Sequence, residues 1–101
     1  MSRQTYLLKR SFTLTVFPSN LAQAAIGKNF TVSNVVAPAA SPEWASQLQD
    51  IGFLVGEHVA IMARGLPGGD PLVVRVGLST FALRLVEAAC IQVVPTATTH
   101  Q

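Results

Sequence analysis

Residues Leu48–Pro71, LQDIGFLVGEHVAIMARGLPGGDP, decide the fold of this chain. The stretch opens with a helix-like segment that stops at Gly52, a residue type suited to the left-handed conformation that ends helices. Gly56 then turns the chain into an apolar strand, His58–Arg64. That strand runs into Gly65–Pro71, where repeated glycine and proline give a strong turn signal. Together these signals predict a compact module that is rich in β-structure.

Working outward, one helix is predicted before this stretch, over residues 42–51. Ser41 offers a capping hydroxyl, and the proline that follows it suits a first helical position. Trp44, Leu48 and Ile51 are spaced so that they share one face of the helix. Phe53, just after the helix, should fold back on that apolar face.

Short strands are predicted along the rest of the chain, with brief helical turns near Leu21 and Glu87. The strands are Phe12–Phe17, Phe30–Val36, His58–Arg64, Leu72–Val76, Thr80–Leu85 and Cys90–Val94. In the strand His58–Arg64, we expect Val59, Ile61 and Ala63 to share one face. Five or six short strands with one inserted helix favour a mainly β fold, a small closed barrel in which closure removes the exposed edges.

Length and composition fit a single domain with little surface charge. The chain has 101 residues, half of them hydrophobic, and only 12% are charged, about half the usual share of roughly 25%. The net charge of +2 comes from the N-terminus, because outside the first ten residues the acidic side chains outnumber the basic ones. The body of the chain therefore lacks the basic patch of a nucleic-acid binder. No apolar run approaches the ~18 residues that a membrane span needs.

The N-terminal segment Phe12–Phe17 requires a choice between two interpretations. It follows Lys9 and Arg10, as the apolar part of a secretory signal would. However, it is short, alternates apolar residues with threonine and ends at Pro18, which is typical of a strand. We therefore expect a strand that adds to an edge of the barrel or joins a neighbouring molecule.

Three motifs resemble those of one known family. Leu48–Gly56 is similar to the L-x-x-(L/M)-G-(L/M)-x-x-G segment of the FeoA family, small bacterial proteins of ferrous iron transport. Pro67–Pro71 resembles the P-L-G-D-P turn of that family, with Gly68 in place of leucine. Leu83–Val93 resembles its closing L-R-x-x-(E/D)-A-x-x-I-x-V, and Leu21–Val36 resembles its opening. The resemblance covers about residues 21–94.

The resemblance implies a fold, a location and a role. The fold is an SH3-like β-barrel with an inserted helix, here over 12–94 between tails at 1–11 and 95–101. The implied role is that of a cytoplasmic accessory that binds FeoB, the membrane ferrous iron transporter, and regulates uptake. The alternative is a stand-alone regulatory barrel that responds to metal, resembling the C-terminal domain of iron-dependent repressors.

The residues predict no enzyme. The only histidines are His58 and His100, the latter near the C-terminus, and no Ser-His-Asp set can be assembled with them. Cys90 is the only cysteine, which fits a reducing compartment, and its apolar neighbours predict a buried core residue. The Gly65–Pro71 turn lacks the Gly-Lys-Ser/Thr ending of a phosphate-binding loop. No cofactor is therefore required.

Glu57 and His58 are the only adjacent pair of metal-ligating side chains, for ferrous iron or zinc. They cannot complete a site alone, so two copies of the chain would have to meet. Neighbouring strand residues also point to opposite faces, which weakens the pair. The low surface charge favours a homodimer, although the sequence leaves the oligomeric state open.

The predicted partner-binding residues are Phe53, Leu54, Val55 and Leu66. The first three lie between Gly52 and Gly56, at a corner of the predicted barrel. Leu66 lies at the tip of the predicted hairpin. Apolar side chains on loops are frequent in protein contacts. The competing interpretation for Phe53 is that its ring fills the junction between helix and barrel.

Overall fold

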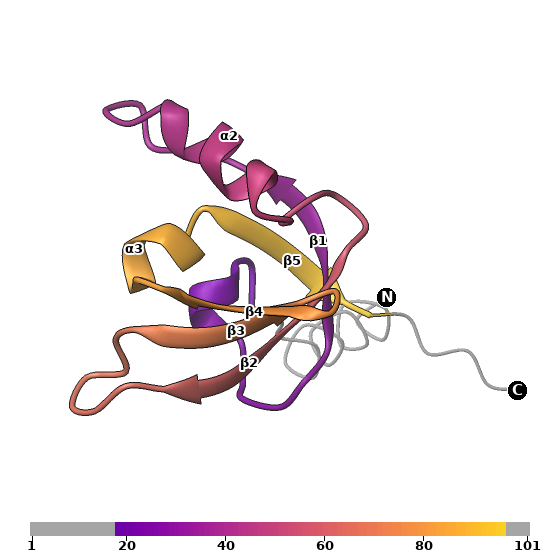
Figure 1. The fold of residues 1–101 in the computed structure, drawn as a ribbon, viewed down its shortest axis with the longest axis vertical. Coiled ribbons are helices and arrows are strands. Elements are labelled where there is room, and N and C mark those ends of the chain that lie inside the picture. Colours follow the sequence, from indigo (N-terminus) through magenta and orange to yellow (C-terminus); the bar gives the residue numbers. More distant parts are fainter. Residues whose placement is uncertain (1–17, 97–101) are drawn as a thin grey trace, which may run out of the picture.

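The computed structural model describes residues 18–96, which form five strands and three short helices (Figure 1). In chain order the elements are η1 Leu21–Gln23, β1 Phe30–Val35, α2 Glu43–Asp50, β2 His58–Arg64, β3 Leu72–Val76, β4 Ser79–Leu83, α3 Leu85–Ala88 and β5 Ile91–Pro95. The strand predicted at Phe12–Phe17 and the domain boundary predicted at residue 12 lie outside the described residues. β5 extends to Pro95, slightly beyond its predicted end.

The strands form one antiparallel sheet in the order β4-β3-β2-β1-β5. The sheet curls around the apolar side chains of its inner face, as in an SH3-like barrel (Figure 1). This confirms the predicted mainly β fold. Within residues 18–96, however, no ladder joins β4 to β5. The barrel is therefore partly open, and two sheet edges remain where complete closure was expected to remove them.

An irregularity in β2 changes which residues face the core. Val59 and Ile61 are buried as predicted, but the pairing of β2 with β3 shifts register between Ile61 and Ala63. Such a bulge breaks the strict alternation of side chains. The prediction that Ala63 shares a face with Val59 and Ile61 was therefore wrong, and both Met62 and Ala63 are exposed.

Helix α2 ends as the glycine signal predicts. Gly52 has φ +124°, and its N–H donates to the carbonyl of Gln49 at 3.0 Å. The N–H of Phe53 donates to the carbonyl of Leu48, also at 3.0 Å. These two bonds form the Schellman motif, which commonly brings a residue after the glycine onto the helix's apolar face. The start of the helix differs from expectation, because the Ser41 hydroxyl does not cap it.

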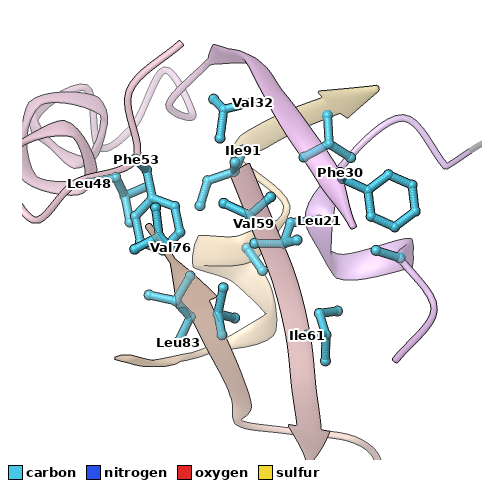
Figure 2. Packing of buried hydrophobic residues seen from close by; sticks show 14 of the residues in the cluster. Leu21, Phe30, Val32, Leu48, Phe53, Val59, Ile61, Val76, Leu83 and Ile91 are labelled. Atoms are coloured by element: carbon cyan, nitrogen blue, oxygen red, sulfur yellow. The ribbon is translucent and has the colours of Figure 1, made fainter. Parts of the chain in front are cut away.

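The core lies within the curled sheet, and η1, α2 and α3 each contribute a buried side chain to it, with Phe53 on the side of α2. The Phe53 ring is 0% exposed and lies near Leu48 and Val76 in Figure 2. It also packs at a tilt against Phe81, with ring centroids 6.3 Å apart. Leu48 is buried, whereas Ile51 is 40% exposed, so the predicted apolar face of α2 only partly reaches the core.

Two polar contacts attach the hairpin between β2 and β3 to distant segments. The Arg64 guanidinium donates to the carbonyl oxygens of Ala22 and Ala24, at 3.0 and 2.8 Å. The carboxylate of Asp70 accepts the backbone N–H of Leu85, the first residue of α3, at 3.0 Å. Hydrogen bonds that involve a charged group are stronger than neutral ones. The hairpin is therefore held both to the segment that includes η1 and to the start of α3.

We predict that Phe53→Ala lowers the free energy of unfolding by about 3–5 kcal/mol, because it leaves a cavity in the core. The matched control is Val55→Ala, two positions along the same loop, where a 66% exposed side chain is shortened. The control should change the free energy by less than about 0.5 kcal/mol. Urea denaturation of both variants measures these values. Equal effects would contradict the placement of Phe53 in the core.

Candidate protein-contact site

The predicted contact residues lie at opposite ends of β2. Leu54 and Val55 belong to the loop that enters the strand, and Leu66 belongs to the hairpin that leaves it. A strand of this length separates its two ends by roughly 20 Å. The structure therefore does not gather the four predicted residues into one surface.

Phe53 must be removed from the contact surface. Its side chain is fully buried, so it has no exposed area to offer a partner. The reason is the end of α2, where the N–H of Phe53 is bonded to Leu48 and the ring turns inward. Leu54, Val55 and Leu66 are 50%, 66% and 91% exposed, and their roles in binding stay predictions.

The loop that carries Leu54 and Val55 is fixed by backbone hydrogen bonds to β1. The N–H of Gly56 donates to the carbonyl of Val32, and the N–H of Val32 donates to the carbonyl of Glu57, both at 2.9 Å. A third bond of 2.9 Å joins the N–H of Glu57 to the carbonyl of Leu54. The loop thus presents apolar side chains on a backbone that is already ordered, which lowers the entropy lost on binding.

Sequence analysis missed Leu78, which adds to this end of the barrel. It occupies the two-residue turn between β3 and β4 with Gly77, whose φ is +58°. Leu78 is fully exposed. The sequence signal that could have found it is the Gly77-Leu78 pair between two predicted strands, because two-residue hairpin turns favour glycine. The N–H of Gly77 donates to the carbonyl of His58 at 3.2 Å, so this turn lies beside the loop before β2. We call Leu54, Val55 and Leu78 the apolar rim.

The predicted metal pair does not form a metal site within one chain. Residues 18–96 contain no group of three His, Cys, Asp or Glu side chains placed to hold an ion. His58 lines a surface hollow of about 580 Å³ together with Arg75, and Glu57 is not among the lining residues. A guanidinium in the same hollow disfavours a divalent cation there. Any metal bound by Glu57 and His58 would need ligands from elsewhere.

A comparison with protein families identifies the architecture. The family model described as the FeoA domain matches residues 19–95. The chain belongs to the FeoA family. Residues 1–18 precede the matched region.

Solved structures of FeoA proteins agree with this assignment. FeoA of Stenotrophomonas maltophilia, solved with zinc, is 36% identical over 75% of this chain and 89% of that chain, with a TM-score of 0.68. It is described as an SH3 domain protein and a candidate activating factor of bacterial ferrous iron transport. FeoA of Chlorobium tepidum is 27% identical over 80% and 73% of the two chains, with a TM-score of 0.64.

A third structure, iron(II) transport protein A of Clostridium thermocellum, is 28% identical. The match covers 75% of this chain but only 44% of that one, with a TM-score of 0.63.

No curated protein matches the chain. Two of these FeoA proteins are described by a role in iron transport rather than by an enzymatic activity. No helix within residues 18–96 is long and apolar enough to cross a membrane.

The titratable groups of this FeoA domain fit a structural role. Cys90 is buried as predicted, and burial, followed by the nearby Glu87 carboxylate, raises the pKa of its thiol. A raised pKa keeps the thiol protonated at neutral pH, which is unfavourable for a nucleophile. The pKa of Glu87 is raised by burial but lowered more by hydrogen bonds from Arg84 and by the charge of Arg84, so it is lowered overall.

Glu87 anchors the start of α3. Its carboxylate accepts the backbone N–H of Arg84 at 2.8 Å and forms an ion pair of 3.2 Å with the Arg84 guanidinium. The guanidinium also lies over the Trp44 ring, 5.9 Å from its centroid. This arrangement connects the start of α3 to α2.

We predict that Glu87→Gln lowers the free energy of unfolding at pH 7 by about 1 kcal/mol, because it weakens this cap. Since the folded-state pKa of Glu87 is lowered, its contribution is present above the unfolded pKa and is lost as pH falls through the folded value. The difference between parent and variant should therefore shrink below about pH 4. Urea denaturation at pH 7 and pH 3 measures it, and a difference that does not depend on pH would contradict the assignment.

Proposed function

We propose that this FeoA protein is a cytoplasmic accessory of bacterial ferrous iron uptake, which binds a FeoB-type membrane transporter and regulates it. The family assignment supports a role as a transport accessory. The apolar rim is the observation that supports a contact with the transporter. The protein acts by binding, without chemistry of its own.

The rim has the features of a contact site. Its three apolar side chains are 50%, 66% and 103% exposed on two neighbouring loops, and the first loop is fixed by hydrogen bonds to β1. Burial of such a side chain contributes about 1.5–3 kcal/mol. Because only 12% of the residues are charged, burying the surface around the rim desolvates few charges and costs little free energy. A partner with an apolar cleft is therefore the complementary surface.

The location of the rim predicts which substitutions weaken binding to the transporter's cytoplasmic domain. Leu54→Asp and Leu78→Asp should each weaken binding by about tenfold or more, because each places a charge in an apolar contact. Leu66→Asp is the comparison variant, because this leucine is 91% exposed and lies at the other end of β2. Biolayer interferometry with purified proteins measures the affinities.

The outcome of this comparison discriminates between the two ends of the barrel. Weaker binding by the rim variants alone supports the rim. Weaker binding by Leu66→Asp alone would place the contact on the hairpin, and equal binding by all four proteins would exclude both surfaces.

A second candidate function is a metal-responsive regulatory barrel, favoured by the zinc complex of the Stenotrophomonas maltophilia relative. In this chain Glu57 and His58 are the proposed ligands, completed by a second copy in a homodimer. Isothermal titration of the protein with zinc or ferrous ion should then show binding at half an ion per chain, lost in His58→Ala. Absence of heat in the parent would rule out this function and leave the contact with the transporter untouched.

A further inference from the structure

The two edges of the sheet differ in how they are covered. The outer edge of β5 is occupied, because the N–H of Val93 donates to the carbonyl of Ser19 at 3.2 Å and Asn20 forms a bridge with Gln92. β5 then ends at Pro95, which has no N–H to offer. At the other edge, β4 pairs only with β3 within residues 18–96. The outer side of β4 is therefore the edge available for another strand.

The geometry of the hairpin determines which groups that edge presents. The two-residue turn makes Val76 and Ser79 a hydrogen-bonded pair, and pairs along an antiparallel ladder alternate. Thr80 and Ala82 therefore direct their N–H and C=O groups away from β3. Two donors and two acceptors are aligned for an incoming strand.

β4 also lacks the usual protection of an edge strand. Its sequence STFAL contains no charge and no proline, and its pairing with β3 has no bulge. Natural edge strands normally carry one of these features or are covered by another segment. A groove of about 230 Å³ lies beside β4, with Ala82 and Leu83 on one side and Trp44 and Leu48 of α2, with Ile51 just after it, on the other. An extended chain between a helix and an edge strand is a known mode of peptide recognition.

The chain itself contains a segment that matches this edge. Phe12–Phe17 (FTLTVF) has no charge and alternates apolar residues with threonine. At about 3.3 Å per residue it would span roughly 20 Å, enough to cover β4 from end to end. It lies before residue 19, where the FeoA match begins, so it is an addition to the family domain. Pro18 and Ser19 then lead directly to the edge of β5.

We propose that Phe12–Phe17 adds to the outer edge of β4 as a sixth strand, in the groove between α2 and β4. Phe12, Leu14 and Val16 then lie on the same side of the sheet as Phe81 and Leu83. Thr13 and Thr15 lie on the opposite side with Thr80 and Ala82. Cross-strand threonine pairs stabilise such an arrangement. The proposal does not rest on the contact with the transporter, although Leu78 of the apolar rim immediately precedes β4.

Amide hydrogen exchange of the full chain, followed by NMR, tests the proposal. The N–H groups of Thr80 and Ala82 should exchange slowly in the parent and at least tenfold faster when Thr13→Pro and Thr15→Pro are combined, because proline removes a donor and disrupts the strand. The control Gln4→Pro places the same residue outside the segment and should change neither rate. The N–H of Phe81, which pairs with β3, should stay protected in every variant and shows that the barrel remains folded.

Sedimentation equilibrium of the same proteins shows which copy donates the segment. A monomeric parent assigns the segment to its own β4. A dimer that dissociates in the proline variant assigns it to the β4 of a second copy, and either result supports the added strand. Unprotected N–H groups at Thr80 and Ala82 in the parent, or protection unchanged in the proline variant, would overturn the proposal. Protection that appears only after addition of the transporter's cytoplasmic domain would overturn it in favour of a partner peptide.

Discussion

The hydrogen bond from the N–H of Phe53 to the carbonyl of Leu48 is the interaction on which the rest of the structure depends. It requires the positive φ of Gly52, and it turns the chain so that the Phe53 ring enters the core. The ring then contacts Phe81 on β4 and joins α2 to the sheet. Leu48 is the only buried residue of α2, and Trp44 is partly buried against the core, so the Phe53 ring adds a large, fully buried contact where the helix ends.

The same turn decides which side chains of this three-residue segment are buried and which are exposed. Phe53 faces the core, and the next two side chains must leave it, because the loop is drawn back to β1 by bonds at Val32. The apolar rim is therefore a consequence of how the helix ends. It lies where Leu78 also emerges, since the carbonyl of His58 accepts a bond from Gly77. A barrel with few charged residues can thus offer a local apolar contact on rigid loops.

The partly open barrel gives the molecule a second kind of surface. When the two outer strands of an SH3-like sheet do not pair with each other, their outward-facing N–H and C=O groups need other hydrogen-bond partners. At β5 the chain covers its own edge with Ser19 and Asn20, and at β4 the described residues leave the edge uncovered. Side-chain contacts at the rim and backbone pairing at β4 are physically different modes of binding, and the two surfaces meet where Leu78 precedes β4.

The sequence by itself determined the type and order of the elements. Glycine at positions 52 and 56 and the turn Gly65–Pro71 carry conformational information locally, and the alternation in β3 needs no distant partner. The local pattern gave the wrong face for Ala63, because a bulge arises from pairing with β3. Only the tertiary structure decided that the Phe53 ring is fully buried and packs against Phe81, that no ladder joins β4 to β5 within residues 18–96, and that the turn with Leu78 lies beside the loop before β2. Each of these depends on contacts between segments far apart in the chain, which no local pattern of residues records.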